Sequence, residues 1–194
     1  MQAAQSCLEQ TLQPNEIIVV DNGSNTLPRD GYFPDPVQTL TEEKSGAGFA
    51  RLAGVAQSVA SHFLFLDSDD LLDASALQNL AIVSMESGAD VTFGAIQNFQ
   101  DYPEGRALGK ISNYPLASSS LISSQCFEAY GLFEGDNYSF SVWIEKLRAS
   151  GANFENIDQV VAQRRIHSSN MGFSKESRRF YLDMARSRLE ARRK

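Results

Sequence analysis

The sequence predicts an α/β domain in which helices flank a mainly parallel sheet. Short apolar runs rich in β-branched or aromatic residues, at 17–20 and 63–66, are typical of buried strands. Segments with apolar or small residues at helical spacing lie between them, at 2–12 and 45–60. Strands that alternate with helices in this way indicate an α/β architecture, and 194 residues suffice for one such domain.

The first third of the chain is expected to contain a helix and two strands. Apolar residues three and four positions apart predict a helix over 2–12, which Pro14 and Asn15 should end. The run Ile17–Val20 predicts a strand that leads into the turn-forming sequence "DNG". A second, less apolar strand is expected around 37–40.

The next part continues the alternation of helices and strands. The segment "SGAGFARLAGVAQSVA" predicts a glycine-rich start to a helix, with alanines that suit close packing. A strand is expected over 63–66, a helix over 75–85 and a further strand over 90–96. The sequence contains no internal repeat and no low-complexity linker.

Charge is distributed unevenly along the chain. The formal net charge is −7, yet residues 175–194 hold eight basic residues against three acidic ones, which leaves −12 for the rest. An acidic body of this kind argues against nucleic acid as a partner. The basic end, 176–194, is expected to form an amphipathic helix after a domain spanning 1–175.

Targeting and redox features point to the cytoplasm. The longest apolar runs fall far short of the roughly 18–20 residues needed to cross a bilayer. The opening "MQAAQSCLEQTL" has neither the basic start nor the apolar stretch of a secretory signal. Cys7 and Cys126 have no metal-ligand spacing, so we expect reduced thiols in a cytoplasmic protein.

Three carboxylates follow the strand expected over 63–66, namely Asp67, Asp69 and Asp70. They are consistent with a solvated turn or with a cation site, because close carboxylates repel one another unless screened or bridged. Ligands of open α/β sheets bind beyond the carboxyl ends of strands, where Asp21 should also lie. This shared position favours a functional site, and Mg²⁺ or Mn²⁺ would suit its oxygen ligands.

Six segments resemble the family 2 glycosyltransferases with the GT-A fold. They are "QSCLEQTLQPNEIIVVDNGSNT", "GAGFARLAG", "FLFLDSDDLLD", "LISSQCFEAYGLFE", "WIEKLRASG" and "RRIHSSN", in the order of that family, and they span residues 5 to about 170. The resemblance implies metal-dependent transfer, with inversion, of a sugar from a nucleoside diphosphate sugar to an acceptor hydroxyl. It further implies a glycan or lipid-linked acceptor, as in polysaccharide biosynthesis.

The resemblance also assigns roles to the acids. Asp67-Ser68-Asp69 matches the DxD motif, so that Asp69 is expected to bind Mn²⁺ or Mg²⁺ and Asp67 to assist at the ribose or the metal. Ser68 is placed with the nucleotide sugar. Asp70 is expected either to support the metal ligands or to cap the following turn. Asp21 matches the residue that contacts the nucleotide base.

Two basic side chains complete the implied site. Arg51 matches the arginine of the family's "ARN.G" motif and would face the diphosphate, although Leu52 replaces the motif's asparagine. His167 matches a late histidine that joins the metal or the diphosphate in many GT-A enzymes. A structural role for each of these two residues stays open from the sequence.

Two departures from the family pattern affect the predictions. The chain starts at the helix that should follow a first strand of the type "VSVIIPTYN": either this sequence omits that strand, or its start is misassigned, or the protein lacks it. If the protein lacks it, we expect an open sheet position, with instability, strand borrowing or a homodimer as the consequence. The family's catalytic base should fall on Tyr138 or Ser139, and neither is acidic. Asp136 is the candidate base, and loss of the base is the alternative.

Other functions compatible with the acids are a degenerate nucleotide-sugar-binding module without turnover and a nucleotidyltransferase sharing the GT-A core. A phosphatase of the haloacid dehalogenase class also uses DxD after a strand, but Leu71 stands where that class has Thr or Val. For the basic helix 176–194, docking on the domain competes with peripheral contact to the inner membrane surface, which would bring the enzyme to a lipid-linked acceptor.

Overall fold

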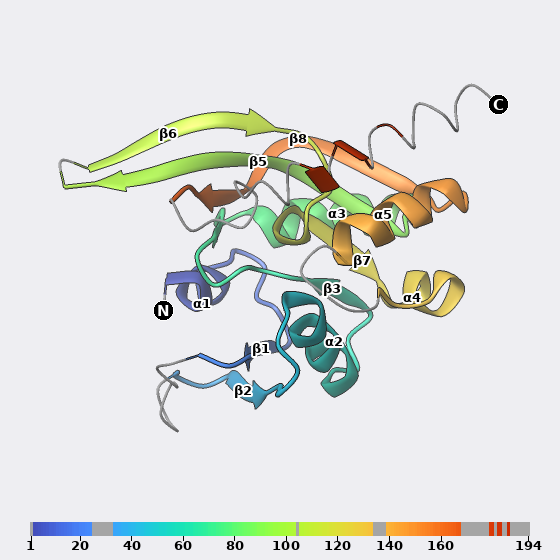
Figure 1. Ribbon diagram of the computed structural model, residues 1–194, viewed down its shortest axis with the longest axis horizontal. Helices are drawn as coiled ribbons and strands as arrows, with labels where there is room; N and C mark the ends of the chain where they lie inside the picture. The colour runs from blue at the N-terminus through green and yellow to red at the C-terminus, as the bar shows by residue number, and fades with distance from the viewer. Residues whose placement is uncertain are drawn as a thin grey trace.

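The protein folds as the expected α/β domain (Figure 1). The structure, a computed structural model, describes residues 2–24, 33–103, 105–133, 139–167, 179–180, 182–183 and 186. The helices are α1 (Gln2–Leu8), α2 (Ala47–Gln57), α3 (Ala76–Ser87), α4 (Ser124–Tyr130), α5 (Ser139–Ala149) and the short 3₁₀ helix η1 (Ala117–Ser119). The strands are β1 (Ile17–Asp21), β2 (Val37–Thr41), β3 (His62–Leu64), β4 (Leu71–Leu72), β5 (Val91–Tyr102), β6 (Gly105–Ser112), β7 (Ser120–Ser123) and β8 (Phe154–Arg165).

The strands form two separate sheets. β1 and β2 pair in parallel, with Ile17 opposite Val37 and Asp21 opposite Thr41. The other six strands form a sheet in the order β3-β7-β5-β8-β4, with β6 on β5. Figure 1 shows β1 and β2 lying apart from the larger sheet, beside α2. The acids of the turn after β3 therefore lie where the two parts of the fold meet.

The larger sheet is mixed, which corrects the expectation of a mainly parallel one. Only its β5–β8 pair is parallel, while β3–β7, β5–β7, β5–β6 and β4–β8 are antiparallel. The reason is chain length between strands. Only two residues separate Tyr102 from Gly105, and a parallel neighbour would require a crossover of a dozen residues or more. β5 and β6 must therefore form a hairpin.

The first helix is shorter than its sequence pattern predicts. It ends at Leu8 rather than at 12, because the following residues bond to the loop before α3. The Gln10 side chain donates to the Asp73 carbonyl at 2.7 Å and accepts from the Leu77 N–H at 2.9 Å, and the Thr11 N–H donates to the Ala74 carbonyl at 2.8 Å. Tertiary hydrogen bonds thus replace the last helical turn.

The main core lies between α5, α4 and the larger sheet. Its centre is an aromatic cluster in which Phe133 and Trp143 pack with ring centroids 5.5 Å apart. The Trp143 indole N–H donates to the Gly131 carbonyl at 2.8 Å, which satisfies its one polar group. Each fully buried apolar side chain of this size contributes roughly 1.5–3 kcal/mol. Phe65 packs on the same cluster and carries the chain from β3 toward the acids.

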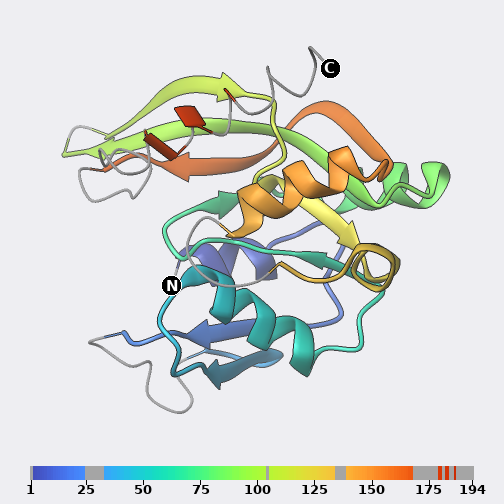
Figure 2. The same ribbon diagram turned by 45° about the vertical axis from the view of Figure 1, so that its right-hand side comes forward.

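The β5–β6 hairpin projects beyond the rest of the fold (Figure 2). β6 is exposed along nearly its whole length, including the apolar side chains of Leu108 and Ile111. In the part of the hairpin nearer the core, the Phe99 ring is fully buried, with the guanidinium of Arg106 4.2 Å and that of Arg165 4.6 Å from its centroid. The guanidinium groups of both arginines therefore lie close to the Phe99 ring.

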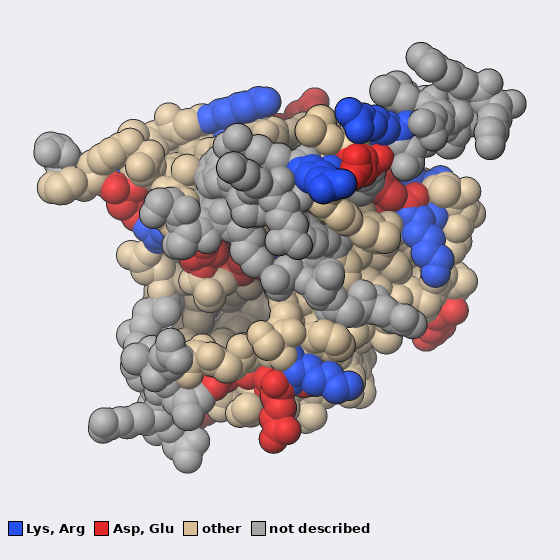
Figure 3. Space-filling view, viewed as in Figure 1, with Lys and Arg blue, Asp and Glu red and all other residues tan. Residues whose placement is uncertain are grey.

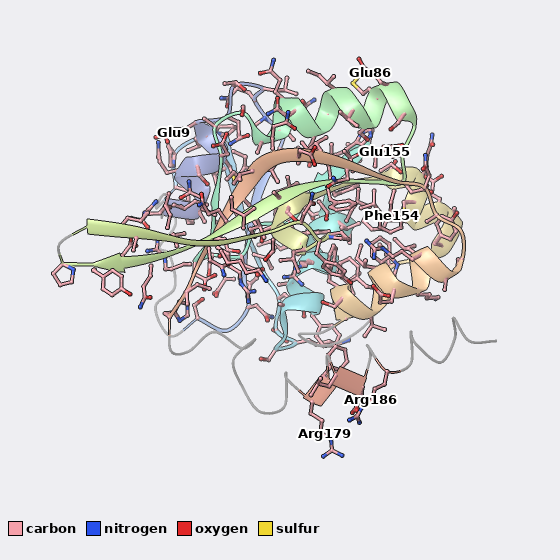
Figure 4. All side chains as sticks on the ribbon, turned by 90° about the horizontal axis from the view of Figure 1, so that it is seen from above. Glu9, Glu86, Phe154, Glu155, Arg179 and Arg186 are labelled. Atoms are coloured by element: carbon pink, nitrogen blue, oxygen red, sulfur yellow. The ribbon has the colours of Figure 1, made fainter. Side chains whose placement is uncertain are left out.

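Most of the basic segment 176–194 lies outside the described residues. Among those described in it, Arg179 and Arg186 project away from the body (Figure 4). Both lie near Asp183 of the same segment, with N–O distances of 4.0 and 3.6 Å. Surface pairs of this kind contribute little to stability.

Acidic and basic side chains are both spread in small groups over the face of the molecule shown in Figure 3. Within the residues that the structure describes, no helix is both long and apolar enough to span a bilayer.

Candidate functional site

The acids form a tight turn that joins two strands. β3 ends at Leu64 and β4 begins at Leu71, and between them the Asp70 N–H donates to the Asp67 carbonyl at 3.0 Å. β4 then pairs with β8, with Leu71 opposite Gln163. This pairing brings the end of β8, and with it the late histidine, beside the acids. The three carboxylates of the turn point to three different partners.

Asp67 forms an ion pair with Arg51. The guanidinium Nη2 lies 2.7 Å from Asp67 Oδ1, and the Arg51 side chain is 12% exposed against 50% for Asp67. The guanidinium also lies 5.8 Å from the centroid of the Phe140 ring. The structure thus brings Arg51 of α2 to the acid turn, where it contacts the Asp67 carboxylate and the Phe140 ring; its predicted contact with the diphosphate stays a prediction.

Asp69 pairs with His167. The His167 Nε2 atom lies 2.8 Å from Asp69 Oδ2, and both side chains are little more than one-third exposed. His167 stands two residues past the end of β8, 98 positions from Asp69 in the sequence. The structure therefore brings together two of the three residues that the sequence proposed as metal ligands, Asp67 being the third. Ser68, between Asp67 and Asp69, is exposed at the tip of the turn.

Asp70 points inward. Its side chain is buried, with 3% of the residue exposed. Oδ2 accepts a hydrogen bond from the Ser118 hydroxyl at 3.0 Å, and Oδ1 accepts one from the Arg165 N–H at 3.1 Å. Burial, followed by repulsion from Asp67, raises the pKa of the Asp70 carboxyl to about 7. Ser118 belongs to a serine run, SSS, that gives no sign in the sequence of this contact.

Arg165 connects the end of β8 to the acids and to the hairpin. Its Nε donates to the Asp69 carbonyl at 3.1 Å. Its other guanidinium nitrogens pair with the Asp101 carboxylate and the Gln2 side chain. Arg165 is thus engaged by three parts of the fold, and the sequence marks it only as one of two consecutive arginines.

Asp21 ends β1 and shapes the following turn, since its Oδ1 accepts from the Ser24 N–H at 3.0 Å. The next residue, Asn22, connects the loop after β1 to the loop before α2. Its Oδ1 accepts from the Gly46 N–H at 2.7 Å, just before α2, and its Nδ2 donates to the Lys44 carbonyl at 2.6 Å. In the sequence, the one sign of this role is an asparagine that directly follows a strand.

The position of the catalytic base is described in part. Asp136, the candidate base, and Tyr138 lie outside the described residues. Ser139 opens α5 and is 6% exposed. Glu145, further along α5, accepts a 2.6 Å hydrogen bond from the Tyr114 hydroxyl.

The side chains of the acid turn offer few ligands for a divalent cation. No group of three or more His, Cys, Asp or Glu side chains in the described ranges could hold a metal by itself. Mg²⁺ and similar ions, however, are commonly bound by one or two carboxylates together with substrate phosphates. The convergence of Asp69 Oδ2 and His167 Nε2 fits such a two-ligand site.

Comparison with known proteins identifies relatives for most of the chain. The sequence model for glycosyl transferase family 2 matches residues 2–140. The chain is 26% identical over 163 residues to the uncharacterized glycosyltransferase YwdF of Bacillus subtilis, covering 75% of this chain and 61% of that protein. It is 25% identical over 194 residues to the uncharacterized glycosyltransferase RP339 of Rickettsia prowazekii, covering 87% of this chain and 60% of that protein.

Solved structures show the same fold. TarS residues 1–349 of S. aureus, in complex with UDP-GlcNAc, superimposes with a TM-score of 0.69 at 16% identity, covering 87% of this chain and 55% of that one. The complex of the same protein with UDP gives a TM-score of 0.66 at 16% identity, covering 85% and 56%. The chain thus spans less than two thirds of the length of these proteins.

The family model covers residues 2–140, well over half of the chain. The predicted family and fold are both confirmed. This chain belongs to glycosyltransferase family 2 and has the GT-A fold.

Proposed function

We propose that the protein transfers a sugar, with inversion, from a nucleoside diphosphate sugar to an acceptor hydroxyl, and that Asp69 and His167 hold the divalent cation on which the reaction depends. The observation that carries the proposal is the 2.8 Å contact between Asp69 Oδ2 and His167 Nε2 on the acid turn. Membership of a family of glycosyltransferases supports the reaction class. The UDP and UDP-GlcNAc complexes of TarS make a uridine nucleotide the first donor to test.

The chain's own residues would divide the work of binding. Arg51 holds the Asp67 carboxylate in place through the 2.7 Å ion pair. Asp21, at the end of β1, is proposed to contact the base, and Asn22 fixes the loop before α2 against it. The exposed Ser68 is proposed to contact the nucleotide sugar. Mn²⁺ or Mg²⁺ bound at Asp69 and His167 would neutralise the diphosphate, which gains charge as it leaves.

The transfer itself requires a base. The acceptor oxygen attacks the anomeric carbon, the bond from that carbon to the diphosphate oxygen breaks, and the proton of the acceptor hydroxyl passes to a carboxylate. Asp136 remains the proposed carboxylate. Ser139, at one of the two positions where the family places its acid, is buried at the start of α5 and cannot take that proton at neutral pH.

The buried Ser139 favours one alternative, a nucleotide-sugar-binding module without turnover. The two functions share the metal site and differ in product formation. Release of nucleoside diphosphate that depends on Asp136 would support the transferase, and metal-dependent binding without product would support the module.

The first test is binding of UDP and UDP-sugars, measured by calorimetry with and without Mn²⁺, in the parent chain and in Asp69→Ala. Removal of a metal ligand should weaken Mn²⁺-dependent nucleotide binding by more than about tenfold while the fold is kept. Equal affinities in the two proteins would contradict the assignment of Asp69. Asp158→Ala, an exposed acid near the start of β8, is the matched control and should bind as the parent does.

A further inference from the structure

We propose that Asp70 is a positioning residue, whose buried carboxylate fastens the end of β8 to the acid turn and thereby holds His167 against Asp69. The functional meaning of this role rests on the transferase proposed above. The contact network itself can be tested without any nucleotide or metal.

The Asp70 carboxylate is unsuited to direct contact with a substrate. It is buried, and each of its oxygens already accepts a hydrogen bond from a different element. Oδ1 accepts from the backbone N–H of Arg165, the last residue of β8, at 3.1 Å, and Oδ2 accepts from the hydroxyl of Ser118 in η1 at 3.0 Å. Any effect of Asp70 on chemistry must therefore pass through the groups it holds.

The groups it holds lead directly to the histidine. Asp70 fixes the Arg165 backbone, and the next N–H, that of Ile166, donates to the Phe99 carbonyl of β5 at 2.8 Å. The Arg165 side chain returns to the acid turn, where its Nε donates to the Asp69 carbonyl at 3.1 Å. His167 follows and meets Asp69 Oδ2 at 2.8 Å. The segment 165–167 is thus tied to Asp69 and Asp70 at three points.

These bonds explain why a carboxylate stands at a buried position. Burying a carboxylate is costly, and an apolar residue would pack there at lower cost if only volume mattered. An apolar residue would leave the Arg165 N–H and the Ser118 hydroxyl without this acceptor. Position 70 therefore requires two polar groups. One must accept a hydrogen bond from the Arg165 N–H of β8, and the other must form a hydrogen bond with the Ser118 hydroxyl of η1. Asparagine supplies both, because its carbonyl can accept from Arg165 and its amide can donate to the Ser118 oxygen.

Histidine NMR provides the test, because the chain has only two histidines, His62 and His167. Their imidazole signals are recorded at one fixed pH in the full chain, without metal or nucleotide, for the parent, Asp70→Ala and Asp70→Asn. Asp70→Ala should move the His167 signals toward those of an exposed histidine and leave His62 in place. Asp70→Asn should keep both histidines as in the parent. Unchanged His167 signals in a folded Asp70→Ala would overturn the proposal.

Asp73→Ala separates positioning from general destabilisation. Asp73 is an acid of the same region, whose Oδ1 accepts from the Ser75 N–H and hydroxyl at 3.1 and 2.8 Å, so its loss removes charge and hydrogen bonds near α3. Its loss should leave His167 unchanged. A shift of His167 as large as that in Asp70→Ala would mean that any nearby destabilisation moves the histidine, and would also overturn the proposal.

If Asp70→Ala does not fold, Ser118→Ala replaces it, since this change removes one of the two anchors of the carboxylate and no charge. It should shift His167 in the same direction by a smaller amount, and an unchanged His167 would count against the proposal. Mn²⁺ titration then gives the functional readout. Broadening of the His167 signals should require about tenfold more Mn²⁺ in Asp70→Ala than in the parent or Asp70→Asn. Suppose that Asp70→Ala shifts the His167 signals but the parent binds no Mn²⁺. The positioning role of Asp70 would then stand, and only the proposed metal site of the transferase would be refuted.

Discussion

Three carboxylates of a single turn have three different environments. Asp67 is half-exposed beside a guanidinium, Asp69 is partly exposed beside an imidazole, and Asp70 is buried with two neutral hydrogen-bond donors. A neutral donor offsets the desolvation of a carboxylate less than a cation does. Burial accordingly raises the pKa of the Asp70 carboxyl. Its titration should therefore be visible in the stability of the whole protein.

The first prediction is that the free energy of unfolding falls between about pH 4 and pH 7. The Asp70 carboxyl ionises near its ordinary pKa of 3.8 in the unfolded chain and near 7 in the folded protein. In this interval the folded state binds the extra proton, so a rise in pH favours unfolding. At 1.36 kcal/mol per pKa unit, the loss attributable to Asp70 is about 4 kcal/mol.

Urea denaturation at pH 5 and pH 7.5 in the presence of EDTA measures this effect. Asp70→Asn cannot ionise and should lose less stability than the parent over the interval. Asp73→Asn should keep the slope of the parent. Parallel pH profiles for Asp70→Asn and the parent would show that the Asp70 carboxyl has an ordinary pKa in the folded protein.

At the scale of elements, the parallel pair β5–β8 holds the site in place. β8 ends at Arg165, and His167 lies two residues further along the chain. β5 lies between β8 and β7 in the centre of the sheet. The ladder between the two strands is irregular at Gly94, where its register shifts between Phe93 and Ala95. A Cβ atom at Gly94 would lie only 2.5 Å from Val161 Cγ1 and 3.0 Å from the Gln159 carbonyl oxygen. The close approach of the strands therefore depends on glycine.

The second prediction is that Gly94→Ala destabilises the protein. Overpacking of a close-packed site typically costs about 1–3 kcal/mol, and Val161, which the new methyl group would meet, is itself fully buried. Gly54→Ala is the matched control, because its Cβ would meet Val20 Cγ2 at an ordinary 3.7 Å in the middle of α2. That change should raise stability by roughly 0.4–1 kcal/mol. Equal midpoints of urea denaturation for the two variants would contradict the tight β5–β8 contact.

At the scale of the whole molecule, the fold leaves several strand edges open in the residues that the structure describes, among them those of β1 and β3. Among the described residues, β1 pairs only with β2, and β3 pairs in its sheet only with β7. Ile18, Val19 and Val20 of β1 and Phe63 and Leu64 of β3 are only partly buried, although both strands are apolar. Unpaired strand edges recruit other strands.

The third prediction is that the 194-residue chain either self-associates or has a low midpoint of thermal unfolding. Light scattering should give an apparent mass that rises with protein concentration, and thermal denaturation should be broad. A monomer that melts sharply at all concentrations would show that the edges are closed in another way. Because β6 is also an exposed edge, the double variant Leu108→Lys, Ile111→Lys serves as the control. It should associate as the parent does if β1 and β3 provide the contact.

The sequence by itself determined the local elements and the residue types of the site. Apolar spacing and β-branched composition located α2, α3, β1 and β2 to within a few residues. The order of six motifs predicted the family and the GT-A fold, and the acids after a strand predicted where a candidate site should be sought. These properties depend on near neighbours in the chain, so they can be recognised without knowing which distant segments meet.

Only the tertiary structure decided which distant groups are partners. Asp69 meets His167 across 98 positions, Asp70 meets Ser118 across 48, and Gln10 ends α1 early through Asp73 across 63. Strand direction in the larger sheet likewise follows from which strands pair, not from their composition. Such contacts arise when the chain folds back on itself and buries polar groups that must then find partners among whatever lies nearby. For this reason the sequence named the acids of the turn, and the fold gave each of them a different partner.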